Sequence, residues 1–217
     1  MTGTIGAVVL AAGRSTRMGG VQKLSAPIGN GTVIGHVVRG VIDAGLPPPL
    51  VVTGHDHDAV VAAIGSLPHM LIHAEDHIDG MAASIRAGIG ACPAQWDGAL
   101  ICLGDMPCVR PQTLAMIAAA GRKAGAASAI VVPRHAGRRG NPLFWGRNYF
   151  AALMRLSGDG GARALLPRLS QHVVSVDTDD AGILIDVDTP ELLEQARLVL
   201  RSSNPQINAD EGGALRK

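Results

Sequence analysis

The chain begins with an apolar run that ends abruptly in small and cationic residues: Val8-Val9-Leu10-Ala11-Ala12-Gly13-Arg14-Ser15-Thr16-Arg17-Met18-Gly19-Gly20, followed by Lys23. We expect Thr4–Leu10 to form a buried strand and Ala11–Lys23 to form the loop after it. Small residues let backbone N–H groups approach a ligand closely. Arg14, Arg17 and Lys23 add positive charge, and no acidic residue precedes Lys23. This loop therefore predicts the binding of a polyphosphate.

Apolar strands and helical patterns alternate along the rest of the chain. Further strands are expected at Leu24–Ile28, Leu50–Thr53, Met70–His73, Ala99–Leu103, Ala129–Pro133, Asn141–Trp145 and Val173–Val176. Helices are expected at 33–42 after a Thr32 cap, at Ala59–Ile64 after an Asp56 cap, at Ala82–Ile89, Pro111–Lys123, Tyr149–Leu156 and Ala162–Leu169, and at 190–200 after a Thr189 cap. This alternation predicts an α/β fold, with a mainly parallel, Rossmann-like sheet between two layers of helices.

Composition narrows the class of protein. The 217 residues are 47% hydrophobic but only 2% aromatic, so the core is built from Ala, Val, Leu and Ile, as in buried parallel sheets. A net charge of +1 argues against a nucleic-acid binder. Three cysteines without a C-x-x-C pair fit a reducing compartment, and no signal peptide or membrane span is apparent, so we expect a cytoplasmic protein. We expect one domain over 1–201 and a flexible tail over 202–217.

A second motif delivers a carboxylate at the end of a buried strand. In Ala99-Leu100-Ile101-Cys102-Leu103-Gly104-Asp105-Met106-Pro107, Asp105 directly follows the apolar run. Ligands of open α/β sheets bind at the carboxyl ends of the strands. Opposite a phosphate loop, Asp105 is well placed to hold Mg²⁺, although taken alone it could equally be an ordinary turn or cap residue.

A third motif is Ile185-Asp186-Val187-Asp188-Thr189-Pro190-Glu191. Alternation along an extended segment places Asp186 and Asp188 on the same side. Either one could supply a second metal carboxylate, or Asp188 and Thr189 could simply cap the last helix.

Six segments in order resemble the MobA-like nucleotidyltransferase family. They are Leu10–Gly19 with Lys23, Gly80–Gly88, Leu103–Pro107, Gly140–Phe144, Gly158–Arg163 and Asp186–Glu191. The resemblance covers nearly the whole chain and implies the three-layer sheet of the nucleotide-diphospho-sugar transferase type. Within the family, the chain most resembles the molybdenum cofactor cytidylyltransferases, because Ala11-Ala12-Gly13 stands where guanylyl relatives usually carry Ala-Gly-Gly or Gly-Gly-Gly. The Cβ of Ala12 narrows the space beside the base, and pocket differences of this size discriminate by about 1–3 kcal/mol.

The resemblance implies a reaction and its partners. CMP would pass from CTP to the terminal phosphate of molybdenum-molybdopterin, forming molybdopterin cytosine dinucleotide and releasing pyrophosphate. The implied partners are CTP, the molybdopterin cofactor and a molybdoenzyme that receives the product, with neither nucleic acid nor membrane. Two anions must meet in this reaction, so charge neutralisation and in-line positioning matter more than a general base.

The resemblance also implies roles for particular residues. Arg17, Lys23 and Asp105 would be catalytic, with Arg17 and Lys23 on the β- and γ-phosphates. Asp105, with Asp186 or Asp188, would hold Mg²⁺. The implied nucleotide-binding set is Leu10, Ala11, Ala12, Gly13, Arg14, Lys23, Gly80, Met81, Ser84 and Asp105. The implied acceptor-binding set is Asn141, Asp159 and Arg163. Asn141 replaces the histidine common in relatives, and it does not titrate near neutrality, which leaves the acceptor less defined than the nucleotide.

Other functions remain open. Guanylyl transfer, or transfer from another nucleoside triphosphate to a sugar or polyol phosphate, would use the same motifs. An NAD(P)-dependent reductase would transfer hydride without releasing pyrophosphate, but the first strand is not followed by G-x-G-x-x-G. A non-catalytic molybdenum cofactor carrier would bind the pterin tightly and would tolerate Asp105→Ala.

Overall fold

The computed structural model describes residues 3–13, 22–76, 80–158 and 161–203. Its main sheet has the strand order β10-β7-β9-β6-β1-β4-β5, with β8 attached to β7. The strands are β1 (Thr4–Ala11), β4 (Leu50–Thr53), β5 (Met70–His73), β6 (Trp96–Leu103), β7 (Ile130–His135), β8 (Arg138–Arg139), β9 (Leu143–Gly146) and β10 (Val173–Asp177). Strand β9 is antiparallel to β6 and β7, whereas β1 pairs in parallel with β4 and β6, β4 with β5, and β7 with β10. The mainly parallel sheet is confirmed.

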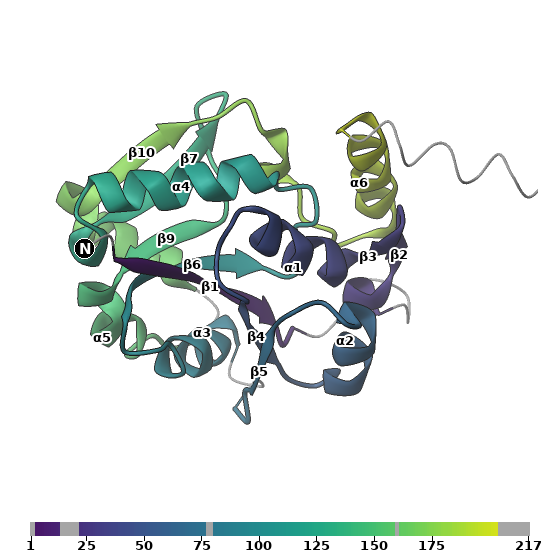
Figure 1. Ribbon diagram of the computed structural model, residues 1–217, viewed down its shortest axis with the longest axis horizontal. Coiled ribbons are helices and arrows are strands. Elements are labelled where there is room, and N and C mark those ends of the chain that lie inside the picture. The colour runs from purple at the N-terminus through teal and green to yellow at the C-terminus, as the bar shows by residue number, and fades with distance from the viewer. Residues whose placement is uncertain (1–2, 14–21, 77–79, 159–160, 204–217) are drawn as a thin grey trace, which may run out of the picture.

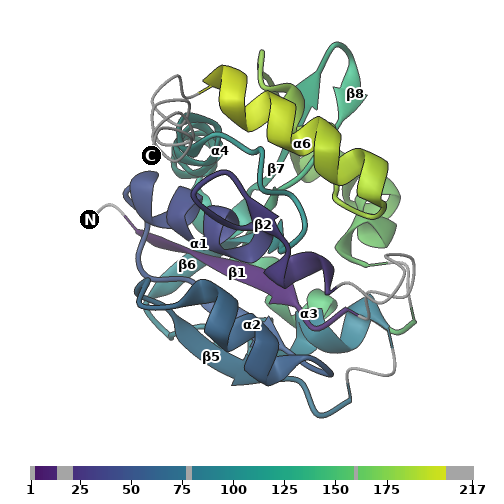
Figure 2. The same ribbon diagram turned by 90° about the vertical axis from the view of Figure 1, so that its right-hand side faces the viewer.

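Helices cover both faces of the sheet (Figure 1). Helices α1 (Val33–Asp43) and α4 (Pro111–Lys123) pack on one face, and α3 (Met81–Gly90) and the short α5 (Phe150–Leu153) pack on the other. Helix α2 (His57–Ile64) packs against α1, and α6 (Pro190–Ser203) contacts the small β2 (Pro27–Ile28) and β3 (Gly31–Thr32) hairpin (Figure 2). None of the helices in the described ranges combines the length and the hydropathy that crossing a bilayer requires.

The position of strand β1 explains why polar residues do not alternate with apolar ones in the first apolar run. Its Ala7 and Val9 belong to the core beneath α1 and α4, whereas Val8 belongs to the core on the opposite face. All three side chains are fully buried. A strand with helices on both faces has no solvent side, so every position is apolar.

Several expected elements differ in the structure. The strand expected at Leu24–Ile28 is wrong at its start, because Lys23–Ser25 forms a 3-10 turn and only Pro27–Ile28 pairs as a strand. Asp56 precedes α2, but its side chain makes no capping hydrogen bond.

The second half of the chain is also less helical than expected. The helix expected at Tyr149–Leu156 is a 3-10 turn, Arg147–Tyr149, followed by the single turn of α5. The helix expected at Ala162–Leu169 is a 3-10 segment, η5 (Ala162–His172), with Pro167 inside it. The Pro167 ring clashes with the carbonyl four residues earlier in an α-helix and cannot donate to it, and the backbone of Leu169 is not helical, so no continuous α-helix forms here.

Three backbone hydrogen bonds join the motifs at one edge of the sheet. Gly104 N–H donates to Leu10 O at 2.9 Å, which ties the end of β6 to the end of β1. Val187 N–H donates to Asp105 O at 2.8 Å, and Asn141 N–H donates to Ile183 O at 2.9 Å. Segments that are far apart in the sequence therefore meet where the parallel strands end.

The buried carboxylate of Asp180 stabilises the junction of these segments from the interior of the protein. Only 4% of Asp180 is exposed, and it accepts hydrogen bonds from Arg110 N–H at 2.9 Å, Thr113 Oγ1 at 2.7 Å and Gly182 N–H at 2.9 Å. A Cβ on Gly182 would lie 2.0 Å from the carbonyl oxygen of Cys108, so only glycine allows this close approach. These contacts hold the segment before Asp186 against the loop after Asp105.

We expect Asp180→Ala to lower the free energy of unfolding by about 2–4 kcal/mol, because it leaves buried donors without an acceptor. Urea denaturation followed by circular dichroism measures the change. Asp179→Ala is the control, since the Asp179 side chain is 88% exposed and its ion pair with Arg110 lies at the surface. A loss for Asp180→Ala no larger than that for Asp179→Ala would contradict this account.

Candidate active site

Lys23 bridges two carboxylates at the carboxyl edge of the sheet. Its Nζ donates to Asp105 Oδ2 at 2.6 Å and to Asp188 Oδ1 at 2.7 Å. The side chains of Lys23 and Asp105 are only 14% and 18% exposed. Asp105 follows Lys23 by 82 positions in the chain and Asp188 follows it by 165 positions. Residues of three distant motifs thus meet at one ammonium group.

The charges in this cluster influence one another. Burial alone lowers the pKa of Lys23, but Asp105 and Asp188 raise it by more, so the net pKa lies above its ordinary value. Lys23 therefore stays positively charged at neutral pH. Burial raises the pKa of Asp186, and the neighbouring charges of Asp188 and Asp105 raise it further. The three carboxylates are close enough to repel one another, and cations stabilise the group.

One oxygen of the cluster has no partner among the residues that the structure describes. Asp105 Oδ1 is buried, and no donor in the described ranges forms a hydrogen bond with it. A buried, unsatisfied carboxylate oxygen is costly unless a ligand or ion completes it. Mg²⁺ prefers carboxylate oxygens and uses few of them, taking its other ligands from phosphate and water. The residues present therefore fit a hard divalent cation held by Asp105 together with Asp188 or Asp186.

The expected nucleotide-contact residues surround the same edge. Leu10 and Ala11 are the last two residues of β1, and the next residue, Ala12, is only 4% exposed. The described part of this loop ends at Gly13. Gly80 precedes α3, and Met81 begins it. Ser84, one turn further along α3, is 6% exposed.

An apolar cavity of about 180 Å³ connects these residues to the expected acceptor side. Leu10 and Met81 line it, and so do Asn141 and Arg163. Ala82 N–H donates to Gly158 O at 3.2 Å, which brings the start of α3 beside the acceptor-side segment. Asn141 and Arg163 also line a second cavity with Asp186. The expected nucleotide and acceptor residues are thus neighbours in space.

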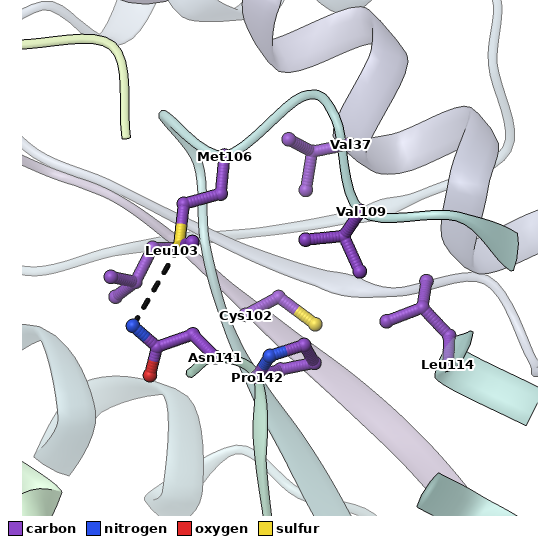
Figure 3. Close-up of a pocket in the computed structure, with 8 residues that line it drawn as sticks. All are labelled: Val37, Cys102, Leu103, Met106, Val109, Leu114, Asn141 and Pro142. Carbon is purple, nitrogen blue, oxygen red and sulfur yellow. Dashed lines mark hydrogen bonds between the residues drawn. The ribbon is translucent and has the colours of Figure 1, made fainter. Parts of the chain in front are cut away.

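Arg14, Arg17 and Asp159 lie outside the described residues, so their expected roles stay predictions. Behind the Asp105 loop, Figure 3 shows a small apolar pocket lined by Leu103, Met106 and Asn141 among others. The Asn141 side-chain N–H donates to Met106 Sδ at 3.6 Å (Figure 3). This weak bond orients the carboxamide but leaves its oxygen available to a ligand.

Sequence reasoning missed two groups of residues near the site. The first is the buried Asp180, which no motif marks. The second is Arg138 and Arg139 in β8, which line the cavity beside Asp186. The sequence does hold a signal for these arginines, because residues 106–158 contain no Asp or Glu while basic residues recur.

We expect Lys23→Met to raise the affinity for Mn²⁺ without nucleotide by about tenfold, because the ammonium no longer competes for Asp105 and Asp188. The role expected for Lys23 on the phosphates predicts that the same change weakens the binding of a nucleoside triphosphate about tenfold or more, because a charge-assisted contact is removed. Isothermal titration calorimetry measures both. Lys123→Met, at the exposed end of α4, is the control. Unchanged or weaker Mn²⁺ binding by Lys23→Met would contradict the bridging role.

Relatives of known sequence match most of the chain. Nicotine blue oxidoreductase of Paenarthrobacter nicotinovorans is 28% identical over 188 residues, which cover 85% of this chain and 92% of that protein. Purine catabolism protein PucB of Bacillus subtilis is 29% identical over 201 residues, which cover 88% of this chain and 94% of that protein. The bifunctional protein GlmU of Kineococcus radiotolerans is 31% identical over 127 residues, 57% of this chain, and the match spans only 26% of GlmU.

Solved structures agree with the sequence matches. The crystal structure of Rv0371c from Mycobacterium tuberculosis H37Rv is 31% identical, with a TM-score of 0.77, and the match covers 90% of this chain and 98% of that one. Rv0371c was also solved as a complex with manganese, which matches with a TM-score of 0.74 at 30% identity over the same shares. The MobA-like NTP transferase domain matches residues 7–173. The resemblance of the six motifs is confirmed: the chain belongs to the MobA-like NTP transferase family.

Proposed function

We propose that this protein is a metal-dependent nucleotidyltransferase that moves CMP from CTP to the phosphate of molybdenum-molybdopterin and releases pyrophosphate. The observation that carries the proposal is the ammonium of Lys23 held 2.6 Å from Asp105 and 2.7 Å from Asp188, beside a buried Asp105 oxygen to which no described residue donates a hydrogen bond. One cation and several carboxylates, placed next to a loop of small residues, suit a triphosphate and its metal ion.

Several of the site residues that the structure describes have a part in the proposed reaction. Lys23 would exchange the carboxylates for the β- and γ-phosphates, whose several negative charges form charge-assisted hydrogen bonds with its ammonium group. Asp105 and Asp188 would then be available to hold Mg²⁺, which supplies positive charge to the phosphates as the pyrophosphate leaves. Gly80 and Met81 would bind beside the ribose and base, while Asn141 and Arg163 would orient the acceptor for in-line attack. The manganese complex of Rv0371c supports a divalent cation in this family.

The choice of CTP rests on Ala12. Its methyl group occupies the strand-to-loop junction beside the expected base position, and a pyrimidine needs less space there than a purine. The acceptor rests on the family resemblance and on the polar cavity beside Asp186. A transferase for another nucleotide, such as GTP, would keep the same carboxylate site.

A second candidate is an NAD(P)-dependent reductase, which the name of the Paenarthrobacter nicotinovorans relative favours. A hydride transfer involves neither a leaving pyrophosphate nor an essential Asp105. Oxidation of NADPH with a dye acceptor, in the absence of any triphosphate, would support the reductase. Pyrophosphate release that depends on a divalent cation would support the transferase.

With Mg²⁺ and molybdenum-loaded molybdopterin, we expect pyrophosphate release from CTP to exceed release from GTP or ATP. Ala12→Gly should reduce the preference for CTP over GTP by about tenfold, because the site gains the volume of one methyl group. A coupled pyrophosphate assay measures kcat/KM for each nucleotide. A preference for GTP in the unaltered protein would overturn the CTP assignment.

We expect Asp105→Asn to lower kcat by about a thousandfold or more, since the amide removes the charge that holds the metal ion. The same pyrophosphate assay at saturating CTP measures this loss. Asp97→Asn is the matched control, because Asp97 lies near the opposite end of the same strand, β6. Activity retained by Asp105→Asn would remove the metal-binding assignment.

A further inference from the structure

Strand β5 is an edge of the main sheet. In Figure 1 the strands follow one another from β10 at the top to β5 near the bottom. Among the strands that the structure describes, β5 pairs only with β4. An edge strand presents backbone N–H and C=O groups along its outer side, and these groups favour pairing with another strand.

The hydrogen bonds to β4 show which backbone groups of β5 face outward. Met70 N–H donates to Pro49 O at 2.9 Å, and Ala74 N–H donates to Thr53 O at 2.9 Å. Because successive residues of a strand direct their N–H groups to alternate sides, the N–H and C=O of Leu71 point away from β4. A further strand can therefore bond to Leu71 without displacing any bond to β4.

The side chains of β5 lack the protection that is usual for an edge strand. The strand reads Met70-Leu71-Ile72-His73 and contains no Asp, Glu, Lys, Arg or Pro. Met70 is 44% exposed and Leu71 is 39% exposed. Charged residues and proline normally prevent edge strands from pairing with other chains. The opposite edge strand, β10, ends in the exposed Asp177, so β5 is the edge better suited to apolar pairing.

The residues that flank β5 favour a second copy of this chain in the antiparallel orientation. His69 precedes the strand, whereas the exposed Glu75 and Asp76 follow it. An antiparallel partner places the start of one strand beside the end of the other, so that each His69 lies near carboxylates of the other copy. A parallel partner would place the two acidic ends together, where like charges repel. The same surface of both copies then forms the interface, as two-fold symmetry requires.

Pairing through β5 leaves the candidate active site accessible. The site lies at the carboxyl ends of β1 and β6, whereas pairing runs along the side of the sheet, and β4 separates β1 from β5. Thr53, at the end of β4, is fully buried, and its Oγ1 donates to Ile72 O at 3.3 Å and contacts His57 Nδ1 at 2.8 Å. These contacts fix β5 against β4, so a partner meets a preorganised strand.

We propose that β5 is a self-association surface, through which two copies of this chain pair in antiparallel fashion and join their main sheets. Leu71 lies at the centre of the interface, where its N–H donates to a carbonyl oxygen of the other copy. The strand has only four residues, so the association is reversible and its extent rises with protein concentration. This inference does not depend on the proposed transfer of CMP.

Sedimentation velocity on the full chain tests this interface. The unaltered protein should shift from monomer to dimer as its concentration rises over about a hundredfold range. Leu71→Lys should weaken dimerisation about tenfold or more, because it brings two positive charges together at the interface. Val174→Lys is the matched control, since Val174 is 36% exposed on the opposite edge strand, and this variant should dimerise like the unaltered protein.

Amide hydrogen exchange measured by NMR provides an independent readout of backbone pairing. The N–H of Leu71 should exchange about tenfold more slowly where the dimer predominates than where the monomer predominates, because the dimer adds a hydrogen bond. The amides of β10 should exchange equally at both concentrations. Met70→Lys, at a more exposed position of the same strand, supplies a second edge variant if Leu71→Lys does not fold.

Five results would overturn the proposal: a monomer at every concentration, an unchanged dimer in both edge variants, an equal loss in Val174→Lys, a dimer without protection of Leu71, or growth into open chains. Growth into open chains would indicate that β5 pairs with β10 of the next copy, because such head-to-tail contacts do not close. Circular dichroism establishes that each variant is folded.

Discussion

The contact of one lysine with two carboxylates is the constraint on which the rest of the site depends. Lys23, Asp105 and Asp188 come from three separate loops, and no two of them are neighbours in sequence. Without the ammonium, the carboxylates would repel one another in a partly buried place. Lys23 therefore offsets part of the negative charge of the carboxylates before a ligand binds. When Lys23 moves to a ligand, that negative charge becomes available to another cation.

The fold serves to bring these loops together and to keep them there. Parallel strands β1 and β6 end side by side, and backbone hydrogen bonds from Gly104 and Val187 join their loops to each other and to the Asp188 segment. Asp180 supports this junction from the buried side. The sheet explains where the site lies, as in other members of the family. The charged side chains at that place determine which chemistry the site favours.

The sequence predicted the sheet and the meeting of the motifs well, because apolar runs and strand ends are local signals. The boundaries of β4, β5 and α4 were predicted correctly. The 3-10 turn at Lys23–Ser25 was missed, and so were the contacts of Lys23 with Asp105 and Asp188, because those contacts join segments far apart in the sequence. Asp180 and the pair Arg138 and Arg139 were missed because their contacts are with segments far away in the chain. The acid-free stretch 106–158 was the one local sign of the latter.

We propose that Lys23 holds Asp105 and Asp188 until a triphosphate and a divalent cation bind together. A crystal structure with Mn²⁺ and a non-hydrolysable CTP analogue, with the ion located by anomalous scattering, tests it most directly. We expect manganese bound by Asp105 together with Asp188 or Asp186, and Lys23 Nζ moved onto the phosphates. Manganese bound elsewhere, or Lys23 still bridging Asp105 and Asp188 with the nucleotide in place, would contradict it.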